Sequence, residues 1–326
     1  MLNENTKDLI LIGNGFDLWQ KLPTSFSCFE KYYYAHKEEI EKKLNIATVE
    51  IGFENDIKKL NYIEMFYAFY PTYGACISEQ KNIKPLIFLC KDFWNDFENN
   101  LLSYLDLESI IWGYGSNEED FYLVPLAMKD LVKLLVEFFT SWINSITVEE
   151  KPSEYNFDNS LFINFNYTNT LEKRFNVKPE QDFHIHGVAS DKKSIVFGHG
   201  VKPQSMPIEY FSSQFFDTAL EFEELVSILY KNPHMRITAL NRFLKKKNIK
   251  LEQFEDIYAL GLSFGKSDFE YYKFLSKQCP QAKWHISYHT NKDKQQILKV
   301  LNKLNITNYE LFNTIEETIK KFKTAT

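Results

Sequence analysis

The fold of this chain is decided by the stretch Leu9-Ile10-Leu11-Ile12-Gly13-Asn14-Gly15-Phe16-Asp17. Four consecutive apolar residues predict a β-strand that is buried on both faces, as strands of parallel sheets are. The two glycines that follow allow a backbone to come close to a ligand, and a helix after such a turn points N–H groups at it. The stretch is therefore either the first strand and turn of a nucleotide-binding α/β fold or a strand and turn with no such role.

Composition narrows the class of protein. The chain has 326 residues, with 38 Lys and Arg against 44 Asp and Glu, so its net charge of −6 argues against general nucleic-acid binding. Its four cysteines form no C-x-x-C pair, which is typical of a reducing compartment. No signal peptide is evident, and charged residues interrupt the longest apolar segment, 121–146. We expect a cytoplasmic protein with no membrane partner.

Strand and helix patterns predict how the rest of the chain is organised. Further strands are expected at Leu161–Phe165, Phe183–His186, Ser194–Phe197, Asp256–Leu262, Ala282–Tyr288 and Ile306–Leu311. Residues 27–150 and 206–250 have helical patterns instead. Strands that alternate with helices favour a mostly parallel sheet. The prediction is one composite α/β domain over residues 1–326, with a Rossmann-like sheet flanked by helices and helical insertions at 27–150 and 206–250.

Ligands of parallel sheets bind at the carboxyl ends of the strands, where the turns Gly13–Asp17, Asn166–Asn169 and Gly261–Asp268 are expected. Asparagine is a poor strand former, so Asn164 and Asn166 in an apolar strand need a reason. Either they end the strand and cap a turn, or Asn166 projects into a ligand site.

The sequence His184-Ile185-His186-Gly187 places two histidines on one face of a predicted strand. Three interpretations are open: a metal pair, a structural pair, or a catalytic histidine. A metal site needs a third ligand, for which His199, His285 or His289 are candidates, but no spacing requires it. A neutral histidine at a strand end, next to a glycine that admits substrate, suits general-base catalysis. No metal is expected.

The turn Gly261–Asp268 also has two interpretations. Ser263, Ser267 and Asp268 can bind ribose or phosphate, or Ser267 and Asp268 can cap the helix predicted from Phe269. The residues favour neither. Gly13-Asn14-Gly15 alone is a weak signal, because it lacks the third glycine of the dinucleotide fingerprint.

The order of the motifs is more specific than any one of them. They are Leu11–Asp17, Leu22-Pro23-Thr24-Ser25-Phe26, Trp94-Asn95-Asp96-Phe97-Glu98, Phe165-Asn166-Tyr167-Thr168, His184–Gly187, Phe197-Gly198-His199-Gly200 and Gly261–Asp268. This series resembles the bacterial abortive-infection family AbiH from residue 9 to about 290. One motif departs from the family, whose usual G-H-S is Gly261-Leu262-Ser263 here. Any role of that histidine is absent or filled by another group.

AbiH proteins are in turn similar to sirtuin-type domains that bind and cleave NAD. That similarity implies NAD as substrate, with Asn166 and His186 as the catalytic pair and Asp17 steadying a developing cation or binding ribose. It implies nucleotide contacts from Gly13, Asn14, Gly15, Phe16, Thr24, Tyr167, Thr168, Gly261, Ser263 and Asp268.

The resemblance therefore predicts an antiphage effector that cleaves the nicotinamide–ribose bond of NAD or a related nucleotide. A phage-derived protein trigger and a homo-oligomer are expected partners. One alternative is a metal-dependent nuclease or phosphodiesterase that uses His184, His186, His199 and Asp17. Another is a nucleotide-sensing module without turnover, in which residues 27–150 bind a phage protein.

Overall fold

The computed structural model describes residues 6–43, 48–53, 56–61, 136–151, 153–196, 198 and 230–324. The chain forms two compact units. The first comprises Met1–Cys28, Trp142–Val196 and Lys231–Thr326, and the second comprises Phe29–Ser141 and Phe197–Tyr230. The sheet and the candidate site belong entirely to the first unit.

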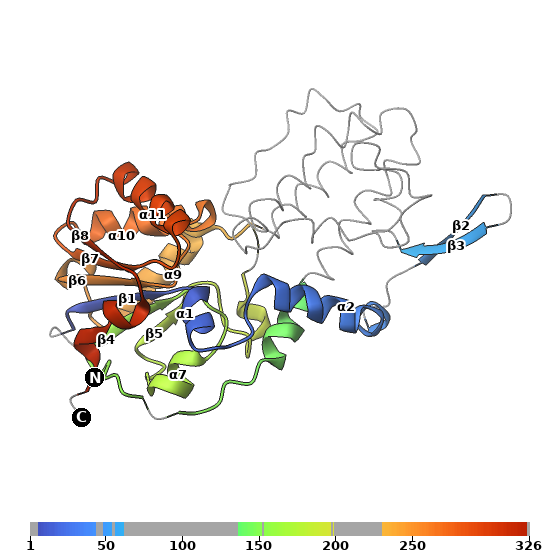
Figure 1. Cartoon of the computed structure of the whole chain (residues 1–326), viewed down its shortest axis with the longest axis horizontal. Helices are drawn as coiled ribbons and strands as arrows, with labels where there is room; N and C mark the ends of the chain where they lie inside the picture. The colour runs from blue at the N-terminus through green and yellow to red at the C-terminus, as the bar shows by residue number, and fades with distance from the viewer. Residues whose placement is uncertain are drawn as a thin grey trace, which may run out of the picture. The chain divides into compact units, whose positions relative to one another are not determined.

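Six parallel strands form the sheet of the first unit, in the order β5-β4-β1-β6-β7-β8 (Figure 1). Their bounds are Asp8–Ile12 (β1), Ser160–Asn164 (β4), Asp182–His184 (β5), Asp256–Leu260 (β6), Lys283–Ser287 (β7) and Tyr309–Phe312 (β8). The strands extend outward from β1 in both directions, first through β4 and β5, then through β6, β7 and β8. This is the Rossmann order, and it confirms the predicted α/β class.

Helices cover both faces of this sheet (Figure 1). They are α1 (Asn14–Trp19), α7 (Thr170–Phe175), α9 (Pro233–Lys246), α10 (Phe269–Gln278), α11 (Asn291–Lys303) and α12 (Ile315–Thr318). Leu9 and Leu11 of β1 share a core with α9, α10 and α11, whereas Ile10 and Ile12 pack with α1, α7 and α12. All four side chains are completely buried, as the uninterrupted apolar run predicts.

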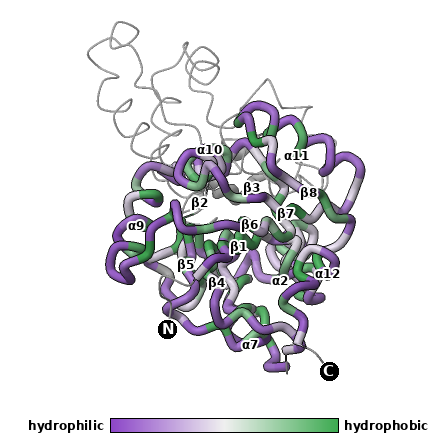
Figure 2. Tube along the Cα trace, turned by 90° about the vertical axis from the view of Figure 1, so that its left-hand side faces the viewer, coloured by the Kyte–Doolittle hydropathy of each residue, from purple (hydrophilic) through white to green (hydrophobic). Residues whose placement is uncertain are grey.

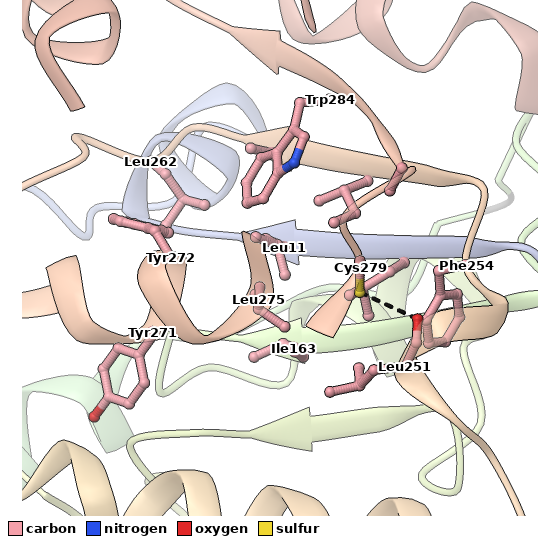
Figure 3. Packing of buried hydrophobic residues seen from close by; sticks show 14 of the residues in the cluster. Leu11, Ile163, Leu251, Phe254, Leu262, Tyr271, Tyr272, Leu275, Cys279 and Trp284 are labelled. Carbon is pink, nitrogen blue, oxygen red and sulfur yellow. Dashed lines mark hydrogen bonds between the residues drawn. The ribbon is translucent and has the colours of Figure 1, made fainter. Parts of the chain in front are cut away.

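Residue hydropathy follows the arrangement of a central sheet between two layers of helices. Figure 2 shows hydrophobic residues gathered along the central strands and hydrophilic residues on the outer turns of the helices. Figure 3 shows one of the two cores, in which Leu11 and Ile163 lie among side chains from α10 and from the loops around it. Burying such side chains stabilises a fold by about 1.5–3 kcal/mol each.

The second unit differs in one detail from the helical pattern expected for residues 27–150. Helix α2 (Phe26–Lys43) begins in the first unit and continues in the second, and residues 136–145 are also helical. Between them, β2 (Thr48–Phe53) and β3 (Asp56–Asn61) form an antiparallel hairpin inside the segment predicted to be helical. Residues 62–135 and 199–229 lie outside the described residues.

The single composite domain and its two insertions stay a prediction. None of the described helices is both long and apolar enough to span a membrane.

The predicted strand Ser194–Phe197 is wrong for the residues that are described. Lys192–Ser194 form the 3₁₀ turn η4, and Phe197 lies outside the described residues. This segment folds back on the loop after β5, where Val196 N–H donates to the His186 carbonyl at 2.8 Å. The backbone of Gly187 has φ +86°, and a Cβ there would lie 2.1 Å from the Ser194 carbonyl oxygen. The close contact between residues 187 and 194 therefore requires glycine at position 187. The segment 194–196 holds the loop after β5 in place and does not add a strand to the sheet.

Candidate functional site

The glycines of the first motif pack two turns together. Gly13 N–H donates to the Leu260 carbonyl at 3.0 Å, and Gly15 N–H donates to the Gly261 carbonyl at 2.9 Å. A Cβ on Gly15 would lie 2.7 Å from the Gly261 Cα, so only glycine allows this approach. These amides already have partners within the chain. Pyrophosphate binding over this turn stays a prediction.

Leu262, at the position where the resemblance to AbiH implies a histidine, is buried against the same turn. A Cβ on Gly13 would lie 2.6 Å from its Cδ2 atom. Phe16 is also completely buried, with its ring 5.3 Å from those of Trp19 and Phe175. Both side chains belong to the hydrophobic cores, so Leu262 takes no polar role and Phe16 can offer a nucleotide only its backbone.

Asp17 holds the loop that follows β4. Its two carboxylate oxygens accept hydrogen bonds from the hydroxyls of Thr168 and Thr170, both at 2.7 Å. Burial raises the pKa of Asp17 to about 6, and the two threonine hydrogen bonds oppose this rise. In the structure Asp17 is a positioning residue, and its contact with a nucleotide stays a prediction.

Asn166 links the end of β4 to the turn after β1. Its Nδ2 donates to the Gly13 carbonyl at 3.0 Å, and its own N–H donates to Asn164 Oδ1 at 2.9 Å. The turn interpretation of the two asparagines is thus correct in part. Asn166 also lies at the carboxyl end of the sheet, as a ligand-binding residue would.

The expectation that His184 and His186 share a face is wrong, because β5 ends at His184 and the chain turns there. His184 Nε2 lies 3.1 Å from Asp182 and 3.7 Å from Glu172. Burial lowers the pKa of His184, but the adjacent carboxylates of Asp182 and Glu172 outweigh it and raise the pKa to about 10. The ring of His186 instead packs 5.5 Å from that of Phe165.

His186 belongs to a cluster of buried polar side chains that comes from three segments: the loop after β5, the residues just before α9 and the start of α10. The His186 cluster consists of His186, Lys231, Asp268 and Tyr271. Asp268 Oδ1 lies 3.6 Å from His186 Nε2 and also 3.6 Å from Lys231 Nζ. The rings of His186 and Tyr271 are 5.6 Å apart. Figure 3 shows Tyr271 at the edge of the hydrophobic cluster, with its hydroxyl pointing away from the other labelled side chains.

Three polar atoms of this cluster are buried and have no hydrogen-bond partner among the described residues. They are His186 Nε2, Asp268 Oδ1 and Tyr271 Oη. Buried polar groups are nearly always hydrogen-bonded in proteins, so three together need an explanation. Such a concentration of unused donors and acceptors is typical of a ligand site.

Electrostatics keep the imidazole of His186 neutral. Burial lowers its pKa well below the usual range, and the nearby positive charges of Lys231 and Arg236 lower it further. Burial raises the pKa of Asp268, while Lys231 opposes the rise by attracting the carboxylate. The arrangement combines an uncharged proton acceptor with a carboxylate that a lysine helps to ionise.

His186 Nε2 and Asp268 Oδ1 are close enough to share one hydrogen-bonding oxygen atom. Because His186 Nε2 and Asp268 Oδ1 are 3.6 Å apart, an oxygen can lie at about 2.8 Å from both. A water molecule placed there would donate to both of them, whereas a sugar hydroxyl, with its single hydrogen, would donate to one. The cluster therefore places two neighbouring acceptor atoms, His186 Nε2 and Asp268 Oδ1, where a hydroxyl group could be recognised.

The structure shows that Asp268 makes no capping hydrogen bond, and its contact with ribose or phosphate stays a prediction. Asp268 occupies the N-cap position of α10, but its side chain faces His186 and Lys231. Sequence reasoning missed Lys231 and Tyr271. The one signal that could have drawn attention to Tyr271 is its place on the aromatic helix that follows Asp268.

The other predicted nucleotide contacts differ in their surroundings. Asn14 is the first residue of α1, Thr24 is buried, and Ser263 is exposed. The Tyr167 hydroxyl donates to the Val196 carbonyl at 2.9 Å and so braces the loop of His186. His199 lies outside the described residues.

Fold and site together define a Rossmann-like α/β protein with a buried polar cluster near the carboxyl ends of its parallel strands. The family model for bacteriophage abortive infection AbiH matches residues 9–288. The chain therefore belongs to the AbiH family, as the order of its motifs predicts, and membership implies a role in abortive infection. Searches of curated proteins and of solved structures gave no significant match.

Proposed function

We propose that this protein is an antiphage effector that hydrolyses the nicotinamide–ribose bond of NAD or of a related nucleotide at the His186 cluster. The observation that carries the proposal is the group of buried atoms without hydrogen-bond partners, His186 Nε2, Asp268 Oδ1 and Tyr271 Oη. The Rossmann strand order supports it, because such sheets bind dinucleotides at the carboxyl ends of their strands.

The proposed reaction requires the protein to position NAD and water and to stabilise the positive charge that develops on the ribose. The bond between nicotinamide nitrogen and ribose C1′ breaks, and its electron pair leaves with nicotinamide. The ribose becomes an oxocarbenium-like cation, which the carboxylate of Asp268 stabilises. Water attacks C1′ and gives its proton to His186 Nε2, so the products are nicotinamide and ADP-ribose. No metal is needed for this step.

The remaining predicted residues act by positioning in this proposal. Asn166 and Asp17 fix the loops around the strand ends through Gly13, Thr168 and Thr170. Lys231 helps to keep Asp268 ionised. The sirtuin-like nucleotide contacts along the Gly13 and Gly261 turns belong to the same proposal, as do cytoplasmic activation by a phage-derived protein and assembly of several copies.

The histidine-based nuclease alternative has weaker support. His184 and His186 have different partners, and both carboxylate oxygens of Asp17 accept hydrogen bonds from threonines. These residues therefore do not form a common metal site among the described side chains. The nucleotide-sensing alternative makes the same prediction of nucleotide binding as the enzyme. Only a measurement of turnover distinguishes the two.

The test is incubation of the full chain with NAD, with and without extract from phage-infected cells. We expect nicotinamide and ADP-ribose in equal amounts, measured by chromatography. Binding of NAD without turnover in either condition would favour the sensor. Cleavage of RNA or DNA that stops on chelation, with NAD left intact, would favour the nuclease.

A further inference from the structure

A second polar cluster lies at β5, on the sheet face that α7 covers. It consists of Glu172 from α7 with Asp182 and His184 from β5. One ligand atom from each residue lies within 4.8 Å of the others. This face is opposite the one that carries α10 and Tyr271, so the cluster is separate from the proposed reaction site.

The three side chains leave polar atoms unsatisfied. The Asp182 side chain is only 1% exposed, and its Oδ1 atom has no hydrogen-bond partner among the described residues. Glu172 Oε2 and His184 Nε2 are also buried and also have no hydrogen-bond partner among the described residues. Two buried carboxylates that face the same imidazole nitrogen repel each other. They need a positive charge between them, because an unpaired buried charge is costly.

Neighbouring groups orient the ligands as they do in metal sites. His184 Nδ1 lies 3.0 Å from the Asn166 carbonyl oxygen, which can only accept, so Nδ1 carries a proton and donates it there. The other nitrogen, Nε2, faces both carboxylates. Asn164 Nδ2 donates to Asp182 Oδ2 at 3.0 Å and fixes that carboxylate. A histidine held by a carbonyl and a carboxylate held by an amide are typical outer-shell contacts.

We propose that Glu172, Asp182 and His184 bind a divalent transition-metal ion of the Zn²⁺ class. Metal–ligand bonds of about 2.0–2.2 Å place ligand atoms roughly 3.0–3.5 Å apart. The separations of 3.1 Å and 3.7 Å from His184 Nε2 to the two carboxylates are close to this range. An imidazole nitrogen among the ligands favours zinc, copper, iron or nickel over calcium or magnesium.

The ion acts structurally. It joins α7 to β5, and through the His184–Asn166 hydrogen bond it steadies the loop that carries Asn166. The competing occupant of the cluster is a proton on His184, which would form an imidazolium paired with both carboxylates.

The test uses the full chain, stripped with chelator, dialysed and titrated with Zn²⁺ by calorimetry and with Co²⁺ by visible absorption. We expect one ion per chain and an increase in melting temperature. Because removing a group that merely orients a metal ligand already costs 10- to 100-fold in affinity, Glu172→Gln and His184→Gln should each weaken binding by at least about 10-fold. The Glu172 side chain is 27% exposed, so Glu172→Gln should still fold, which circular dichroism checks.

His285→Gln is the matched control, because His285 faces the single carboxylate of Asp256 at 2.7 Å. It should leave Zn²⁺ affinity unchanged. Absence of Zn²⁺ and Co²⁺ binding by the folded chain would overturn the proposal in favour of the imidazolium. Equal affinity in the wild type, Glu172→Gln and His184→Gln would also overturn it. Neither result bears on NAD turnover at the His186 cluster.

Discussion

His186→Gln is expected to lower nicotinamide release from NAD by about 10²- to 10⁴-fold while the chain stays folded. Glutamine is polar and of similar length, so it can still bond to neighbours of the imidazole. Its amide nitrogen cannot take up a proton at neutral pH, and the attacking water would keep its proton. Because His186 is buried as a neutral side chain, the exchange leaves no new charge in the core. Nicotinamide release at saturating NAD measures the effect.

The control for this variant is again His285→Gln, a histidine of the same unit whose partner is Asp256. It should turn over NAD at the wild-type rate. Wild-type activity in His186→Gln would remove the proposed base from the mechanism. A variant that has lost its circular dichroism signal would be replaced by His186→Asn, judged by the same assay.

Gly261→Ala is expected to cost about 3 kcal/mol or more in the free energy of unfolding, or to prevent folding. The backbone of Gly261 has φ +63°, which costs a residue with a side chain roughly 1–2 kcal/mol. An added Cβ would also lie 2.3 Å from the backbone nitrogen of Phe16 and 2.4 Å from the carbonyl carbon of Gly15. Those are main-chain atoms, so the turns after β1 and β6 would have to separate. Urea unfolding followed by tryptophan fluorescence measures the loss.

Ser263→Ala is the control, because Ser263 is an exposed residue of the same turn. Its free energy of unfolding should change by less than about 0.5 kcal/mol. An unchanged free energy of unfolding in Gly261→Ala would contradict the close packing of the turn after β1 against the turn after β6.

Much of the fold follows from local patterns. The run Leu9–Ile12 forms the buried central strand as predicted, because a strand enclosed on both faces needs apolar residues at every position. The carboxyl ends of β5 and β6 were placed two residues too late, since Ile185 and Leu262 are apolar residues that pack in the core from loops. The hairpin of β2 and β3 was missed inside a segment read as helical.

The candidate site was predicted only in part, because its contacts cross long stretches of sequence. His186 and Asp268 stand in visible motifs, but their approach depends on how α10 packs over the sheet. Lys231 has no motif around it, and only the tertiary structure brings it to Asp268. The pairing of His184 with His186 failed for a local reason, since strand alternation stops where β5 ends.

The most direct test of the His186 cluster as the reaction site is a crystal structure with an NAD analogue whose nicotinamide–ribose bond cannot be hydrolysed. We predict that a ribose hydroxyl or an ordered water will lie within about 3.2 Å of both His186 Nε2 and Asp268 Oδ1. The nicotinamide ribose should lie at the carboxyl ends of β4, β5 and β6. An analogue bound elsewhere, with the His186 cluster closed around its own side chains, would contradict the account.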